Sequence, residues 1–65
     1  MNMLDLCKKS GYFKAHIIRM VNGKTFQEKS HNWAIIEGML VAYYEMGVLT
    51  SEDYLHLSRV LMRIY

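Results

Sequence analysis

The side chains that could bind a metal or act as a nucleophile are three histidines and one cysteine, and they are scattered along the chain. Cys7, His16, His31 and His56 are separated by 9, 15 and 25 residues. Structural zinc sites use closely spaced ligand pairs, and a Cys–His dyad also needs a group that orients the base and a site for the oxyanion. The sequence shows neither pattern. We expect ordinary, partly exposed histidines, with no metal and no cofactor.

The carboxylates do not form a catalytic pair either. Glu52 and Asp53 are adjacent and are explained by the start of a helix, where acidic side chains are favoured. Glu37 and Glu45 are eight residues apart, too far along a helix for two carboxyl groups to share a proton. The four glycines are isolated, so no phosphate-binding loop is present. We therefore expect no enzymatic activity.

The net charge of +2 is unevenly distributed. Residues 1–32 contain six basic and two acidic residues, a net charge of +4, whereas residues 33–65 contain two basic and four acidic residues, a net charge of −2. One interpretation is a solvated basic face, and the other is a surface for an anionic partner, either an acidic protein or a nucleic acid. The candidate partner-binding cations are Lys8, Lys9, Lys14, Arg19 and Lys24.

Length and composition indicate one small domain over residues 1–65. With a single cysteine the chain cannot form an intramolecular disulfide, and a free thiol is typical of a reducing compartment. The N-terminus does not resemble a secretory signal. The longest uncharged apolar run, residues 39–44, is far shorter than the roughly 18 to 20 residues that span a bilayer. We expect a cytoplasmic protein without a membrane segment.

Residues 33–46 read as the central helix, because nearly all of them are apolar and only Glu37 and Glu45 are charged. At about 100° per residue the apolar side chains cover an arc of roughly 200°, about twice the stripe of an ordinary surface helix. Two neighbouring elements must therefore cover this helix. We expect it to span residues 31–46, with Ser30 or Asn32 as its N-cap.

The segment before the central helix allows two interpretations. Phe13, Ile17 and Met20 recur at helical spacing and predict a helix over residues 12–21 that ends at Asn22-Gly23. The same Asn-Gly pair is a strong signal for a β-hairpin over residues 16–29. In that register neither sheet face would be consistently apolar, which favours the helix. Residues 24–30 then form a connection, with Phe26 packed beneath it.

The clearest local signal joins the central helix to a last one. Gly47 is expected to end the central helix in the left-handed conformation. Thr50 is then the N-cap of a helix over residues 50–64, with Leu49 and Tyr54 at the positions of a hydrophobic staple. So short a joint predicts antiparallel neighbours. The fold prediction is an all-α three-helix domain with a C-terminal antiparallel helical hairpin.

Several packing predictions follow from these helices. Residues 2–9 could form two helical turns or fray. A close approach of another backbone would explain Gly38 inside a helix, and the alternative is a neutral, exposed glycine. Met46 should fill the core alongside Met39. The predicted core consists of Ile36, Met39, Leu40, Tyr43, Leu57, Leu61 and Ile64.

The function predicted from the sequence is a small non-enzymatic protein-interaction module. Tyr44, Leu55, Met62 and Tyr65 fall outside the inward stripes or suit an adaptable interface, and we expect them, with the basic residues above, to bind a protein partner. Compact chains of this kind are common among phage or mobile-element inhibitors that block a larger host protein such as a nuclease. The alternative is a DNA- or RNA-binding regulator that uses the basic N-terminal half. We expect a homodimer, although a monomer with a free apolar patch stays open.

Overall fold

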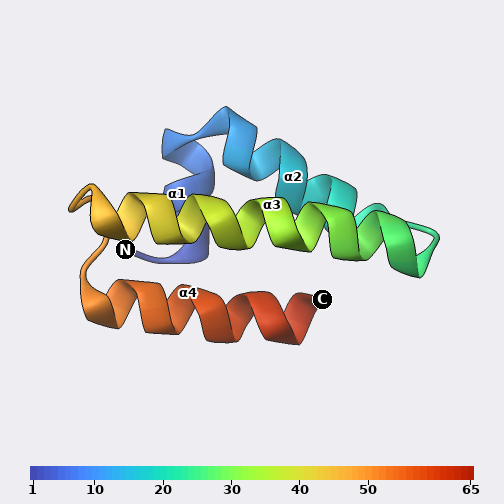
Figure 1. Cartoon of the computed structure of the whole chain (residues 1–65). Coiled ribbons are helices and arrows are strands. Elements are labelled where there is room, and N and C mark those ends of the chain that lie inside the picture. The colour runs from blue at the N-terminus through green and yellow to red at the C-terminus, as the bar shows by residue number, and fades with distance from the viewer.

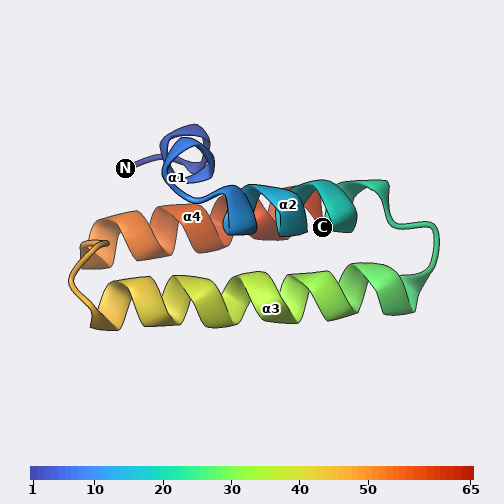
Figure 2. The ribbon, with the colours of Figure 1, turned by 90° about the horizontal axis from the view of Figure 1, so that it is seen from above.

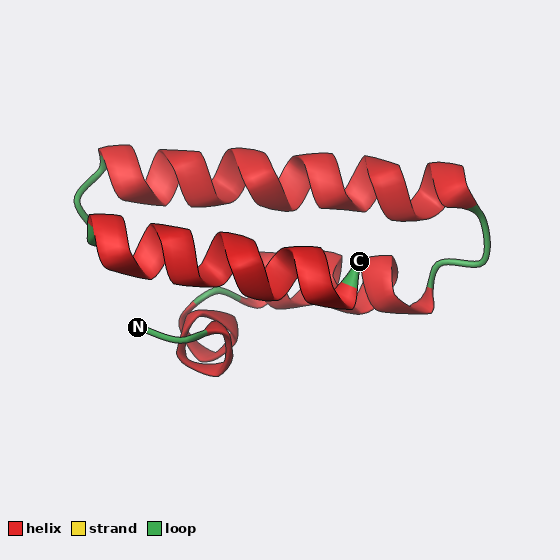
Figure 3. Ribbon diagram, turned by 90° about the horizontal axis from the view of Figure 1, so that it is seen from below, coloured by secondary structure: helices red, strands yellow, loops and turns green.

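The computed structural model describes all 65 residues as four helices without a strand. They are α1 (Met3–Lys9), α2 (Gly11–Asn22), α3 (Phe26–Glu45) and α4 (Ser51–Ile64). Figure 1 shows α2 and α4 on either side of the long helix α3, and Figure 2 shows α1 end-on, across the direction of the other three. Figure 3, coloured by secondary structure, contains only helices and loops. The all-α prediction is confirmed, and the alternative hairpin over residues 16–29 is wrong.

The N-terminal residues form a helix because both of its ends are capped. The Asn2 side chain accepts a hydrogen bond from the Asp5 amide at 2.9 Å. Ser10 ends α1 through its amide, which donates to the Leu6 carbonyl at 2.9 Å, and it begins α2 through its hydroxyl, which accepts from the Phe13 amide at 3.2 Å. One serine therefore ends one helix and starts the next, which allows the chain to change direction there.

The predicted start of the central helix is wrong. The helix begins at Phe26 rather than at residue 31, and its N-cap is Thr25 rather than Ser30 or Asn32. The Thr25 hydroxyl accepts from the Glu28 amide at 3.1 Å, and the Glu28 carboxylate accepts from the Lys24 amide at 3.0 Å. These bonds satisfy amides that would otherwise be left free at the helix start. Only residues 23–25 connect α2 to α3, and Phe26 is 76% exposed instead of packed beneath a loop.

The joint between α3 and α4 follows the sequence signals closely. Gly47 has φ +79°, as the left-handed cap requires. The Thr50 hydroxyl accepts from the Asp53 amide at 3.1 Å, and the Asp53 carboxylate accepts from the Thr50 amide at 3.3 Å, which completes a capping box. Leu49 is buried in the core. Figure 1 shows α4 lying beside α3 after this joint.

The core lies where α2, α3 and α4 meet and includes one side chain from α1. Its members are buried leucines, Phe13, Met20 and Ile36, with the leucines at positions 6, 40, 49, 57 and 61. Four of the predicted core residues, Ile36, Leu40, Leu57 and Leu61, are fully buried. Met39 and Tyr43 are half-buried and pack against this cluster.

Three packing predictions are wrong. Ile64 is 38% exposed because it lies in the last turn of α4, where no following turn covers it. Met46 is exposed because it caps α3 at the end of the bundle, beyond the last helical turn. Gly38 is exposed, and a Cβ atom placed on it would meet nothing within 4 Å, so no backbone of this chain approaches it.

Candidate functional site

The residues that could bind a metal or act as a nucleophile do not form a cluster in the fold. No three His, Cys, Asp or Glu side chains lie together as a metal site would require. Cys7 is half-buried in α1, and burial raises the pKa of its thiol, while the nearby positive charge of Lys14 acts in the opposite direction. A raised pKa leaves less thiolate at neutral pH, which disfavours nucleophilic chemistry at this cysteine.

His16 is a correction to the expectation of partly exposed histidines, because it is only 4% exposed. Its Nδ1 atom lies 2.9 Å from the Tyr12 carbonyl oxygen, one helical turn earlier. The Tyr12 ring covers it, with ring centroids 4.4 Å apart. His16 follows Phe13 by three residues and precedes Met20 by four, so helical periodicity could have placed it on the inward face. Its contacts are those of a structural residue.

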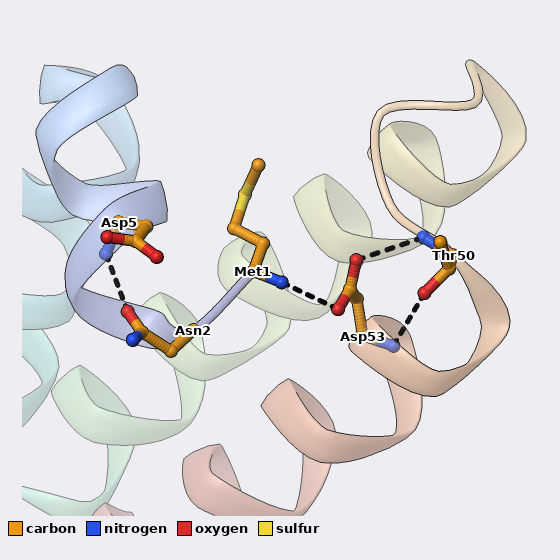
Figure 4. Close-up of polar contacts among 5 residues, drawn as sticks. All are labelled: Met1, Asn2, Asp5, Thr50 and Asp53. Atoms are coloured by element: carbon orange, nitrogen blue, oxygen red, sulfur yellow. Dashed lines mark hydrogen bonds and ion pairs between the residues drawn. The ribbon is translucent and has the colours of Figure 1, made fainter.

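One ion pair links the N-terminal residue to the start of α4. The Met1 ammonium lies 2.7 Å from the Asp53 carboxylate at the start of α4 (Figure 4). This charge, together with the Thr50 amide, lowers the pKa of Asp53 below its ordinary value. The pair fixes the N-terminal segment against the N-terminus of α4.

The most distinctive surface feature is a groove between the first half of α3 and the end of α4. We call it the α3–α4 groove. Its volume is about 440 Å³, and it is lined by Phe26, Ser30, Trp33, Ala34, Met62 and Tyr65. Five of these six residues are hydrophobic. The groove is therefore a concave, largely apolar surface, the kind that excludes water when a partner side chain enters it.

Local contacts fix the shape of the α3–α4 groove. The Trp33 and Tyr65 rings meet with centroids 5.7 Å apart at an angle of 59°, a favourable tilted arrangement. The Tyr65 hydroxyl also makes a hydrogen bond with the Ser30 hydroxyl at 2.5 Å. Phe26 and Met62, 76% and 72% exposed, are the most open of its apolar side chains. Two side chains are therefore held in place and two are free to contact a partner.

The predicted apolar partner residues are spread along α3 and α4. Met62 and Tyr65 line the α3–α4 groove. Leu55 is exposed on α4, two helical turns before Met62 and on the same side of that helix. Tyr44 lies near the joint between α3 and α4, where its hydroxyl is 3.2 Å from the Ser51 hydroxyl and its ring centroid is 5.4 Å from that of Tyr54.

The predicted basic residues are distributed over α1, α2 and the connection to α3. Lys8 and Lys9 lie in the last turn of α1 and line a shallow depression with Met1 and Asp5. Lys14 is exposed in the first half of α2. Arg19, in the last turn of α2, and Lys24, in the connection to α3, are exposed toward the opposite end of that helix.

Of the six residues that line the α3–α4 groove, only Met62 and Tyr65 were predicted from the sequence as partner contacts, and the four on α3 were missed. Phe26, Ser30, Trp33 and Ala34 recur at spacings of four, three and one residues, which places them on one side of a helix, but only if the helix begins before residue 30. The Thr25-x-x-Glu28 spacing was the available signal, since it is that of a helix N-terminus.

Comparisons with known proteins do not assign the chain to a class. No protein-family model, curated protein or solved structure matches it. None of its four helices combines the length and the apolar character needed to cross a lipid bilayer.

Proposed function

We propose that this protein is a non-enzymatic interaction module that binds another protein surface through the α3–α4 groove. One observation carries the proposal: a concave apolar groove in which Phe26 and Met62 stay exposed although the domain is small and needs its apolar residues for a core. Apolar side chains gathered in one concave surface are typical of protein-binding sites. The antiparallel pairing of α3 and α4 is part of this proposal, because both helices contribute to the groove.

Occupying a surface is the simplest mode of action for such a module. We propose that it acts by covering a functional surface of a larger protein, as a phage or mobile-element inhibitor of a nuclease would. Lys24, two positions before the groove residue Phe26, would then face an acidic region of that partner. The free thiol of Cys7 supports a reducing, cytoplasmic environment for this activity.

Site-directed photocrosslinking in the cells that naturally produce this protein tests the proposal. A benzoylphenylalanine residue at position 26 should form a covalent adduct with another protein, whereas the same residue at position 18, which is exposed on α2, should not. Introducing Met62→Glu into the first variant should abolish the adduct, because a charge in the α3–α4 groove is costly to desolvate. No adduct at position 26, or one that survives Met62→Glu, would refute the proposed site.

Nucleic-acid binding is the second candidate, because Lys8 and Lys9 lie together at one end of the molecule. Phosphate contacts release counterions, so such binding must weaken steeply as salt rises. We expect fluorescence anisotropy with duplex DNA to show no binding at low salt. Affinity that falls steeply with salt, and that Lys8→Ala with Lys9→Ala removes, would instead favour this candidate.

A further inference from the structure

The two sides of the α3–α4 groove differ in charge. On the α4 side, Arg59 precedes the groove residue Met62 by three positions, and Arg63 follows it directly. On the α3 side, the exposed polar residues that directly follow groove residues in the sequence are Gln27 and His31. The arginines therefore place positive charge along the α4 side of the groove, and we call these two residues the α4 rim.

Both arginines of the α4 rim are free to bind a partner. Arg59 and Arg63 are exposed, and the one salt bridge of the chain joins Met1 to Asp53 instead. The arginines are four residues apart on the same side of α4, so their Cα atoms are separated by about 6 Å along the helix axis. A guanidinium group binds a carboxylate through two parallel hydrogen bonds. The α4 rim therefore presents two carboxylate-binding groups side by side.

The acidic residues near the groove do not neutralise this charge. The segments that border it, residues 24–37 and 59–65, contain four basic and two acidic side chains, a net charge of +2. Of the two carboxylates, that of Glu28 accepts a hydrogen bond from the Lys24 amide at 3.0 Å. The other belongs to Glu37, which is half-buried and forms no salt bridge with an arginine. This surface therefore favours an anionic partner over a cationic one.

The interior of the groove suits an apolar side chain. Its volume of about 440 Å³ lies in the lower part of the range of ligand pockets, about 300 to 1,000 Å³, so the groove holds large side chains and not a whole folded element. Phe26 and Met62 are the most exposed of its apolar residues. Covering them with an aliphatic or aromatic side chain removes apolar surface from water on both partners. The partner must therefore supply an apolar side chain as well as negative charge.

We propose that the α3–α4 groove binds an acidic segment of the partner protein, with a large apolar side chain of that segment in the groove and two of its carboxylates on Arg59 and Arg63. This inference rests on the proposed function, because it specifies the chemistry of the partner at the same site. The apolar contact supplies affinity by excluding water. The charge pairs set the orientation, and the arginines repel a cationic segment that carries the same apolar side chain.

Single-stranded nucleic acid is also anionic, but the groove suits it less well. Binding of that kind needs open aromatic rings on which successive bases stack. The Trp33 and Tyr65 rings instead contact each other, with centroids 5.7 Å apart. Phe26 is the one aromatic ring of the groove that is mostly exposed, and it offers a platform for a single base. A protein segment uses the whole groove, because its side chain can contact aliphatic and aromatic groups alike.

Selection of peptides from a random display library against the full chain tests the proposal. The enriched peptides should carry a large apolar residue together with two or more Asp or Glu residues. The most enriched peptide, labelled with fluorescein, should bind in fluorescence anisotropy. Without the label it should change the emission of Trp33, the single tryptophan of the chain and a groove residue. No enrichment, or enrichment of neutral or basic peptides, overturns the proposal.

Charge reversal of the α4 rim gives the decisive comparison. The double variant Arg59→Glu with Arg63→Glu should weaken binding of the enriched peptide about tenfold or more at about 0.15 M salt, where distant charges are screened. A peptide with Lys in place of its acidic residues should bind this variant more tightly than it binds the unchanged chain. Such a gain separates an interface effect from a folding defect, and circular dichroism checks that the variant is helical. Affinity indifferent to the reversal overturns the proposal.

The matched control makes the same change of charge on α2. Lys14→Glu with Arg19→Glu should leave the affinity for the enriched peptide within about twofold, because Figure 1 shows α2 on the other side of α3 from α4 and screening at this salt concentration limits its influence. A loss equal to that of the α4 rim variant would place the acidic segment on α2 and overturn the proposal.

The remaining outcomes identify other occupants. A labelled single-stranded oligonucleotide that competes with the peptide and depends equally on the α4 rim would assign the groove to nucleic acid. A crosslink from position 26 only to a second copy of this chain would assign it to a dimer. A crosslink to a different protein that Met62→Glu abolishes, but that reversal of the α4 rim does not affect, would overturn this inference and leave the proposed function standing. The absence of any adduct would refute the proposed function itself.

Discussion

Leu40→Ala should remove most of the free energy that keeps this domain folded. Leu40 is fully buried in the middle of α3 and belongs to the cluster that joins α2, α3 and α4. The substitution deletes three carbon atoms. At about 0.8 kcal/mol for each buried methylene this loses about 2.4 kcal/mol of transfer free energy, and the unfilled cavity brings the expected loss to between about 2 and 5 kcal/mol.

That loss is large compared with the total free energy of unfolding of the domain. A single hydrophobic core in a chain below about 70 residues supplies roughly 3 to 5 kcal/mol, so the variant should be largely unfolded at room temperature. Urea titration followed by far-ultraviolet circular dichroism measures the difference, with both proteins at the same concentration. A protective osmolyte such as trimethylamine oxide, added equally to both, restores a measurable folded baseline for the variant.

The matched control is Leu4→Ala, which makes the same chemical change at a position 63% exposed on α1. It should alter the free energy of unfolding by no more than about 0.5 kcal/mol. If Leu40→Ala cost less than about 1 kcal/mol, or no more than the control, the side of α3 that carries Leu40 could not be the core, and the packing described above would be refuted.

Three further predictions follow from the same structure. The Met1 ammonium lowers the pKa of Asp53, so the ionised carboxylate stabilises the fold above the ordinary aspartate pKa of about 4. That stabilisation is lost as the pH falls through the lowered pKa, so N-terminal acetylation or Asp53→Asn should flatten the loss of stability in an acid titration. An unchanged loss of stability at acid pH would contradict the ion pair. Burial raises the pKa of Cys7, so iodoacetamide should alkylate it more slowly at pH 8 than in urea-unfolded chain, and equal rates would contradict its burial. Gly38→Ala should stabilise the monomer, measured at low concentration, by up to about 1 kcal/mol, because the added methyl group meets no other atom. Gly47→Ala should destabilise the monomer by about 1 kcal/mol, because residue 47 has a positive φ. Thermal unfolding curves that shift in the same direction for both variants would refute these two predictions.

The sequence alone determined the features that depend on neighbouring residues. The cap of α4 is an example, because Thr50, Asp53 and Gly47 make bonds and adopt angles that involve only residues a few positions away. The helical periodicity of α2 likewise favoured a helix over a hairpin, since a strand register would have left no consistent apolar face. The fully buried residues Ile36, Leu40, Leu57 and Leu61 could be predicted for the same reason.

The start of α3 depends on a local signal that apolar periodicity does not contain. Thr25 and Glu28 form a helix N-terminus, but residues 24–30 have no sustained apolar period, and that absence predicts a connection. The consequence reached the site: with α3 starting late, Phe26 was placed beneath a loop instead of on the open side of a helix. Capping bonds set where this helix begins, whereas apolar periodicity shows only which of its sides is buried.

Only the tertiary structure decided which apolar residues stay exposed. Met39 and Met46 look alike in sequence, but Met39 faces the bundle and Met46 lies past its end, a difference set by the length of the neighbouring helices. The contact between Trp33 and Tyr65 depends on how far α4 runs back along α3. Burial and grooves are properties of several segments at once, and periodicity within one segment cannot specify where another segment ends.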